Sequence, residues 1–473
     1  MKRSHRTKVS IEGSHCRASA ANTTITWVAL LSCWLVVRPL FPILAHRSST
    51  LRIRDFGGIG VIFLSLFICI NAVSVQAQPV VGAGLNGASS LTSSAAGRFG
   101  GHATTTSSVS GALGTQNNPA PFQWGIVEIR PNFSYRIVYG DGIQASPGNQ
   151  QSSLIQTIAP GVVIRIGDHW SVDYAANQTL YSQSGFKDSL NHSLGLKRND
   201  DTTFSLGGWD LQFQQNYAGT SEILAETGSQ TQQDVVTTSL GTVRSIGRYL
   251  SLSLGLTQSL RFAGALGNTF EWTTTDWLNY QQVREFGAGI GVGAGYVDIS
   301  KSPNSSFWRA LGRASWQLSP KTGLDVDGGL ETRKSSSIGA IGASNLIYNI
   351  AIRNAPFEHT IFVLTAGRKT TISLFQNAVS EGNLISLSLS QRLLGKLQFS
   401  AQVEQQEIAF SPQGNSIANT RNDEKRSINL GLSAMIRKRG TMGITYQRST
   451  NRSNLVGFGF SSSQYGLQAA WSY

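Results

Sequence analysis

The sequence predicts an all-β protein, a transmembrane antiparallel up-and-down β-barrel of about 16–18 strands with both termini on the periplasmic side. Three observations lead to this fold class. From Gly125 onward, apolar and polar residues alternate with the period of two that marks a strand with two different faces. Charged residues make up 14% of the chain, whereas soluble proteins normally carry about 25%. Short turns also alternate with longer connections, as they do in such barrels.

The segment 51–77 has the pattern of a secretory signal peptide. Its start is basic, an apolar centre runs from Ile59 to Ile70, and small residues precede Gln78. The centre is shorter than the roughly 20 apolar residues that a helix needs to cross a bilayer. We therefore expect cleavage near Ala77.

Two further segments precede the barrel. Residues 1–50 are either an extended leader or an upstream stretch included by a start site placed too early. Residues 78–121 are dominated by Gly, Ser, Ala and Thr and carry almost no charge, so they cannot bury enough apolar surface to fold alone. We expect them to form a flexible periplasmic leader, and we expect the barrel to occupy residues 122–473.

The formal net charge is +13, but its distribution does not support a nucleic-acid partner. Residues 1–77 hold nine Lys and Arg and two acids, which leaves 30 basic against 24 acidic residues in the rest of the chain. The basic residues are not interleaved with aromatic residues on a helix. All three cysteines, Cys16, Cys33 and Cys69, precede residue 78, so the remainder has no disulfide or cysteine–metal site.

The first predicted strand shows the alternation clearly. Val127 and Ile129 face one way, toward lipid, while Glu128 and Arg130 face the other, toward water. No long helical periodicity interrupts this pattern further along the chain. The preferred number of strands is eighteen, near residues 125–139, 154–167, 170–182, 188–197, 203–217, 231–245, 248–261, 271–281, 284–299, 306–318, 321–334, 343–354, 357–370, 383–394, 396–411, 425–437, 440–451 and 457–473.

The predicted connections alternate in length, which is the arrangement of short periplasmic turns and longer outer loops in outer-membrane barrels. A soluble sandwich has no reason to alternate in this way. Short turns are predicted at 167–169, 247–248, 319–321, 354–356, 395 and 438–440, and longer connections at 220–230, 263–270, 371–382 and 411–424.

Trp308 and Trp316 are the candidate aromatic girdle. They share one strand face and lie eight residues apart, which is roughly 26 Å at about 3.3 Å per residue. This spacing brackets an apolar band of the expected height once the strand tilt is included. The alternative is that both side chains belong to the core of a soluble sandwich.

The last strand carries the candidate assembly signal. Tyr465, Leu467, Trp471 and Tyr473 occupy one face of the segment 465–473, with small or polar residues between them. This pattern resembles the carboxy-terminal signal of bacterial outer-membrane barrels, in which the barrel assembly machinery recognises a strand that ends in an aromatic residue.

Several charged residues are expected on the water-filled side of the barrel. If the arginines are unpaired, the lumen is slightly basic and weakly anion-selective; if they pair with acids across the wall, no net field remains. Glu128, Asp173 and Glu404 are further acids on this face. The candidate lumen charges are Arg130, Arg136, Arg165, Arg309, Arg313, Asp325, Asp327, Arg392 and Arg437.

No motif for catalysis, for a cofactor or for a metal is predicted. The glycines at every second position from Gly287 to Gly295 lack the spacing of a phosphate loop. They predict a strand with a bare lumen face that another segment can approach closely. Asp325 and Asp327 point the same way on one strand, as the acids of a barrel protease would, but the preferred interpretation is two lumen carboxylates near a channel wall. The protein is therefore not expected to be an enzyme.

Several local stretches are similar to the second "beta-barrel porin" family, which often occurs with exopolysaccharide secretion systems. The resemblance covers residues from about 160 to 473 and carries over no functional residue. It implies an outer-membrane barrel that passes or accompanies a polysaccharide. The stretches are Leu224-Ala225-Glu226-Thr227-Gly228, Asp276-Trp277-Leu278-Asn279-Tyr280-Gln281, residues 314–322, Pro356-Phe357-Glu358, Phe375-Gln376-Asn377 and residues 391–397.

Two functions follow from these predictions. The first is an aqueous, porin-like channel in the outer membrane of a Gram-negative bacterium, linked to polysaccharide export. The second is a structural or surface-binding barrel with a plugged lumen. The expected partners are outer-membrane lipid and lipopolysaccharide, the barrel assembly machinery and polysaccharide-export components, with no nucleic acid.

Overall fold

The computed structural model describes residues 122–167, 169–198, 205–224, 227–300, 302–336, 343–373, 378–412, 420–436 and 439–473. The predicted signal peptide, the segment 1–50 and the leader 78–121 lie outside the described residues, as does Arg437. Among the described residues, no helix is long and apolar enough to cross a bilayer.

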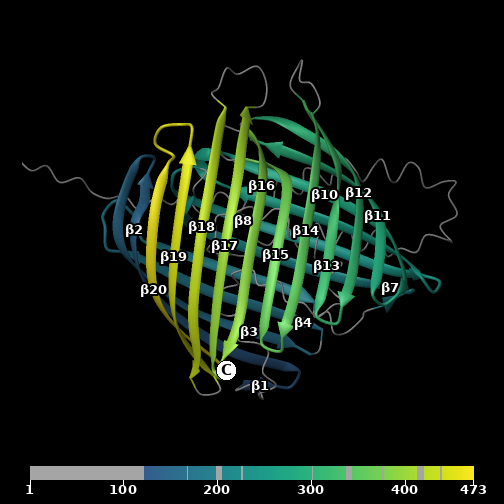
Figure 1. Cartoon of the computed structure of the whole chain (residues 1–473), viewed down its shortest axis with the longest axis horizontal. Helices are drawn as coiled ribbons and strands as arrows, with labels where there is room; N and C mark the ends of the chain where they lie inside the picture. Colours follow the sequence, from purple (N-terminus) through teal and green to yellow (C-terminus); the bar gives the residue numbers. More distant parts are fainter. Residues whose placement is uncertain are drawn as a thin grey trace, which may run out of the picture. The chain divides into compact units, whose positions relative to one another are not determined.

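Eighteen long strands form one antiparallel sheet that closes on itself, which confirms the predicted fold class (Figure 1). Each long strand pairs with the next one along the chain, and the last pairs with the first. The strands are β2 (Val127–Ser146), β3 (Asn149–Ile166), β4 (Trp170–Tyr181), β5 (Ser189–Arg198), β7 (Trp209–Leu224), β8 (Ser229–Ile246), β9 (Leu250–Phe262), β10 (Asn268–Val283), β11 (Phe286–Ile299), β12 (Ser302–Ser319), β13 (Thr322–Ser335), β14 (Ala343–Phe357), β15 (Thr360–Ile372), β16 (Ala378–Leu393), β17 (Leu397–Pro412), β18 (Arg421–Ile436), β19 (Gly440–Ser453) and β20 (Phe460–Ser472).

Two short strands extend this sheet. β1 (Phe122–Trp124) pairs with the start of β2, and β6 (Ser205–Leu206) forms a hairpin with the start of β7. In Figure 1 the strands β14 to β20 of the near wall cross the strands β3 to β8 of the far wall. This crossing follows from closure, because strands must tilt relative to the barrel axis to close a sheet.

The period of two in the sequence becomes an outward and an inward face. On β16, Ile385 and Leu387 are half exposed on the outer surface, whereas Ser386 between them is buried on the inner side. The same holds on β20, where Tyr465 and Leu467 are exposed. A broad band of exposed apolar side chains is unfavourable in water and favourable in lipid. The barrel is therefore a transmembrane barrel whose outer surface faces hydrocarbon.

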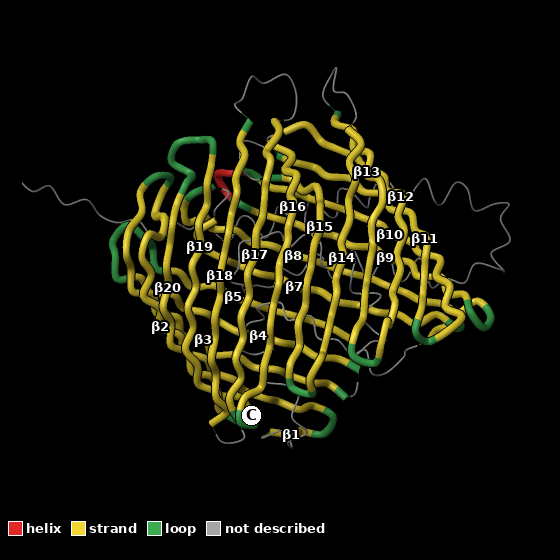
Figure 2. Tube along the Cα trace, in the orientation of Figure 1, coloured by secondary structure: helices red, strands yellow, loops and turns green. Residues whose placement is uncertain are grey.

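The two ends of the barrel differ in their connections. We call the end with the turns 167–169, 247–249, 284–285, 320–321, 358–359 and 394–396 the short-turn end, and the opposite end the long-loop end. The carboxy-terminal residue lies at the short-turn end, near β1 (Figure 2). Consistent with this position, the Ser472 N–H donates to the Arg439 carbonyl, at 3.0 Å, in the connection between β18 and β19.

The predicted alternation of connection lengths is only partly correct. The connection 199–208 at the short-turn end is long, because it contains β6, whereas 147–148 and 300–301 at the long-loop end are short. The predicted connection 220–230 is mostly strand, since β7 and β8 stay paired as far as Leu224 and Ser229. Beyond the lipid band both faces of a strand meet water, so the sequence loses its alternation while the backbone pairing continues.

The turn predicted at 354–356 is also displaced. Pro356 lies inside β14, and the turn is formed by Glu358 and His359. The register shifts between Asn354 and Phe357, so the proline sits in an irregularity where its missing N–H is tolerated.

Candidate functional site: the lumen wall

β11 presents only glycine to the inside of the barrel between residues 287 and 295. Its outward residues Ile290 and Val292 are strongly exposed. The inner face therefore has no side chains of its own there. The sequence predicted a bare lumen face that another segment could approach, and the structure shows which groups do so.

Two aromatic side chains from the neighbouring strands cover these glycines. Trp277 of β10 lies against Gly291, where an added Cβ would be 2.6 Å from the indole ring. Phe307 of β12 covers Gly295 in the same way. Both rings are nearly inaccessible, at 3% and 4% exposure. The glycines thus provide the space in which the two aromatic rings pack against the inner wall.

Three arginines lie over these two rings. The Arg313 guanidinium is 4.3 Å from the centre of the Trp277 ring. Arg309 and Arg333 are 4.4 and 4.5 Å from the centre of the Phe307 ring. Such cation–π contacts contribute about 0.5–2 kcal/mol each. The glycine strand, the rings and the arginines form one inner surface, which we call the lumen platform: Trp277, Phe307, Arg309, Arg313 and Arg333.

Glu331 of β13 neutralises part of the platform. Its carboxylate is 2.7 Å from Arg309 and 3.1 Å from Arg333, and it is almost fully buried. The sequence analysis offered two alternatives, unpaired lumen arginines or arginines paired with acids across the wall. Arg309 is paired, and its partner Glu331 is an acid that the prediction did not include.

Arg313 has a different environment. Its Nε donates to Asn279 Oδ1 at 2.8 Å, and Asp327 faces it across the strand pair β12–β13. Asp327 in turn accepts a hydrogen bond from Asn349 at 3.0 Å. Asp325 lies two residues along on the same inner face, so the two aspartates are lumen carboxylates with different neighbours.

The other predicted lumen charges are distributed around the wall. Arg130 is paired with Glu128 at 3.2 Å, and Arg165 lies opposite Glu128 in the register of β2 and β3. Arg136 and Arg392 occupy inward positions by the alternation of β2 and β16. These residues do not join the lumen platform.

Sequence reasoning missed Glu331, Arg333, Trp277 and Phe307. Glu331 and Arg333 share the face of Asp325 and could have been found by continuing the alternation along β13. Phe307 follows from the outward position of Trp308. Trp277 breaks the polar pattern of the inner face, and its only signal is the glycine strand beside it.

A second inner cluster lies at the long-loop end. Arg421 is fully buried, donates from Nε to Asp423 Oδ1 at 2.9 Å and lies 3.9 Å from the centre of the Phe458 ring. Asn451 donates to the Phe458 carbonyl at 2.8 Å. The connection between β19 and β20 is thereby fixed to the barrel wall. No three His, Cys, Asp or Glu side chains of the described segments are grouped so that they could hold a metal ion.

The predicted girdle and assembly residues lie on the outer surface. Trp308 and Trp316 are both about half exposed on β12, and Phe286 packs edge-on against Trp316 with ring centres 6.3 Å apart. Tyr465, Leu467, Trp471 and Tyr473 share the outer side of β20 and the residue after it. Their roles at the membrane interface and in assembly stay predictions.

No protein-family model matches the chain, and no curated protein matches it. Solved structures show a remote likeness. OpdK of Pseudomonas aeruginosa, solved with vanillate, has 10% identity over 73% of this chain and 99% of its own, with a TM-score of 0.42. OccAB4 of Acinetobacter baumannii has 11% identity over 73% and 98%, with a TM-score of 0.40. The FrpB iron transporter of Neisseria meningitidis has 11% identity over 68% and 62%, with a TM-score of 0.40. Superposition at this level is too loose to support an inference about this chain.

Proposed function

We propose that this protein is an outer-membrane channel whose inner wall conducts small hydrophilic solutes. The observation that carries the proposal is the closed ring of eighteen strands with charged and amide side chains on its inner face. A barrel of about 16–18 strands is wide enough to leave an aqueous passage. The exposed apolar outer band supports its position in a membrane.

The proposed membrane is the outer membrane, because transmembrane barrels with an even number of antiparallel strands are an outer-membrane architecture. The short-turn end would face the periplasm and the long-loop end the outside. This orientation agrees with the usual placement of short periplasmic turns, and it puts the described termini on the periplasmic side. Assembly would use the barrel assembly machinery, which would recognise the outer aromatic face of β20.

The proposed ion preference is weakly anionic. Arg309 and Arg333 share the carboxylate of Glu331, and Arg313 faces Asp327 across the strand pair, so these three arginines outnumber the two acids beside them. A confined basic wall raises the local anion concentration, and salt at about 0.15 M screens this field beyond roughly 8 Å. Passage of an acidic polysaccharide is the finer form of the proposal, and it is supported only by the resemblance of the turn sequences.

Conductance of the purified protein in a planar bilayer tests the channel. The expected result is discrete ohmic openings with weak anion selectivity that increases at low salt. Folded protein that inserts but does not conduct would contradict the proposal.

One observation favours the second candidate function, a barrel with a plugged lumen. Trp277, Leu311 and Ile347 all point inward from β10, β12 and β14, and they form a buried apolar cluster. A fully water-filled lumen would leave such side chains wet. A non-conducting barrel with a protected lumen would therefore be the structural or surface-binding form of this protein.

A further inference from the structure

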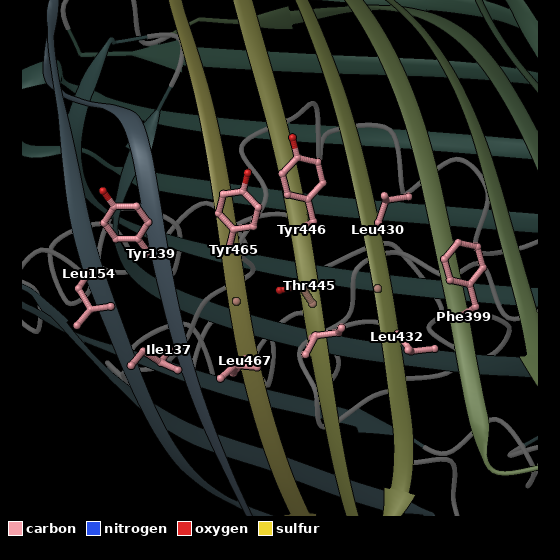
Figure 3. A pocket seen from close by; sticks show the side chains of 13 residues that line it. Ile137, Tyr139, Leu154, Phe399, Leu430, Leu432, Thr445, Tyr446, Tyr465 and Leu467 are labelled. Carbon is pink, nitrogen blue, oxygen red and sulfur yellow. The ribbon is translucent and has the colours of Figure 1, made fainter.

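A groove crosses the outer surface of the barrel where β20 pairs with β2. Its volume is about 620 Å³, and side chains from β17 to β20 and from β2 and β3 line it (Figure 3). The part toward the short-turn end is apolar, with Ile137, Leu432, Ile444 and Leu467 side by side on four strands. Leu467 and Ile444 are more than half exposed. The groove therefore offers an open apolar surface on which a hydrocarbon chain can lie.

Three tyrosines border the other part of the groove. Tyr139, Tyr465 and Tyr446 are directly opposite one another on β2, β20 and β19, and the rings of Tyr446 and Tyr465 are 5.0 Å apart. In Figure 3 the three hydroxyl groups point the same way, toward the long-loop end. Tyrosines with an apolar body and a polar tip commonly mark the boundary between hydrocarbon and headgroups.

An exposed arginine lies just beyond this row on the same outer face. Arg448 follows Tyr446 by two residues, which is about 7 Å along the strand. Its cross-strand neighbours are Ile428 and Ser463, so no acid lies directly beside it in the register. The guanidinium is therefore exposed just beyond the tyrosine row, with no acid opposite it.

Arg452 extends the positive surface toward the long-loop end, beside the ion pair of Arg426 and Glu424. Arg426 donates to Glu424 at 2.8 Å, and Gln405 also donates to that carboxylate, at 3.2 Å. Arg452 lies opposite Glu424 in the register and is exposed. Glu424 is thus already engaged by two donors, and Arg452 adds a second positive group beyond Arg448.

We propose that this groove binds the lipid A part of lipopolysaccharide. An acyl chain lies along Ile137, Leu467 and Ile444, the tyrosine hydroxyls contact the sugar, and a phosphate is held by Arg448 with Arg452 beyond it. Arginine suits this role because its planar donors match phosphate geometry. The inference rests on the proposed orientation, which places the long-loop end in the outer leaflet.

Binding of three purified lipids to the folded protein in detergent tests the site, with native mass spectrometry as the readout. The lipids are lipid A, lipid A without its phosphates, and phosphatidylglycerol. Lipid A is expected to bind tightest. The double variant Arg448→Gln with Arg452→Gln is expected to bind lipid A at least about ten-fold more weakly, because charged hydrogen bonds are lost. The matched control is Arg368→Gln, an arginine paired with Glu381 at 2.9 Å on β15, a strand that does not line the groove.

Equal binding of lipid A and its dephosphorylated form, or unchanged affinity in the double variant, would overturn the phosphate site. Preference for phosphatidylglycerol would overturn the choice of lipid A. Orientation is measured separately, by labelling a cysteine in the variant Val456→Cys from outside intact cells. If Val456→Cys is labelled from outside but lipid A does not bind, the lipid A site is contradicted and the proposed channel is not. If the protein does not conduct, the proposed channel is contradicted and the lipid A site is not.

Discussion

Trp277 packs against Gly291 of the adjacent strand, and the Arg313 guanidinium lies over the indole at 4.3 Å from its centre. The ring therefore contacts both a glycine backbone and a cation. This arrangement requires that residue 291 have no side chain. It also fixes the arginine at a defined height on the inner wall. The position of the Arg313 charge in the lumen therefore depends on a glycine at residue 291.

The first prediction concerns this packing. Gly291→Ala is expected to lower the free energy of unfolding by about 1–3 kcal/mol, because the added methyl group forces the indole to shift. Urea unfolding in lipid vesicles, followed by tryptophan fluorescence, measures the change. Gly287→Ala is the control on the same face of β11, since its Cβ would meet nothing closer than 3.8 Å. Equal effects of the two substitutions would show that packing of Trp277 is not the cause.

The second prediction concerns lumen charge. Glu331→Gln removes the carboxylate shared by Arg309 and Arg333, so anion selectivity is expected to increase and the free energy of unfolding to fall by about 3–5 kcal/mol. Arg313→Gln is expected to shift selectivity the opposite way. Reversal potentials across a KCl gradient measure both variants. A shift in the same direction for both would be incompatible with an inner wall governed by these charges.

The third prediction concerns an acid on the lipid side. Asp276 lies on the outer face of β10, four residues from Trp272 and four from Tyr280, opposite the exposed Leu254 and Val292. A carboxylate at this depth is unfavourable in hydrocarbon, so Asp276→Ala is expected to raise the free energy of unfolding in a bilayer by about 1–2 kcal/mol.

The matched control for this prediction is Asp298→Ala. Asp298 is on the outer face of β11 beyond Tyr296, nearer the long-loop end, and its replacement is expected to change stability little. Loss of stability in Asp276→Ala would instead indicate that the carboxylate contacts a polar partner on the outer surface.

The fourth prediction concerns closure of the barrel. Replacing Trp471 and Tyr473 by Ser is expected to abolish most assembly, because β20 loses the outer aromatic side chains next to its pairing with β2. Heat-modifiable migration on a gel reports the folded barrel. The comparison is the double variant Trp308→Ser with Trp316→Ser, which removes two exposed aromatics from β12 and should still assemble. Equal assembly of both double variants would remove the special role of β20.

The fifth prediction concerns orientation. Val456 is fully exposed in the connection between β19 and β20, and His359 is exposed in a turn at the opposite end. In a protein whose remaining cysteines all precede residue 78, a membrane-impermeant maleimide should label Val456→Cys on intact cells and leave His359→Cys unlabelled. The reverse labelling pattern would show that the barrel has the opposite orientation in the membrane.

The sequence was most informative where one face of a strand meets lipid. All eighteen predicted strands exist, because contact with hydrocarbon demands apolar residues at every second position, as at Ile385 and Leu387. Prediction failed where both faces meet water: the pairing of Glu222 with Thr231 near the long-loop end has no such pattern. The lumen platform could be found only in part. Alternation places Arg309 and Arg313 inward, but which acid pairs with which arginine depends on strand register, and Glu331 became the partner of Arg309 through the alignment of β12 with β13.

The pairing of β2 with β20, from Asn132 opposite Ser472 to Asp141 opposite Ser463, makes the order of strands a cycle. A cycle has no first member, so the hydrogen-bonded lattice does not depend on which strand is synthesised first. A circular permutant with residues 473 and 122 joined by a linker and the chain opened between Glu358 and His359 would keep every one of the eighteen long-strand pairs. What would change is the order in which the pairs can form.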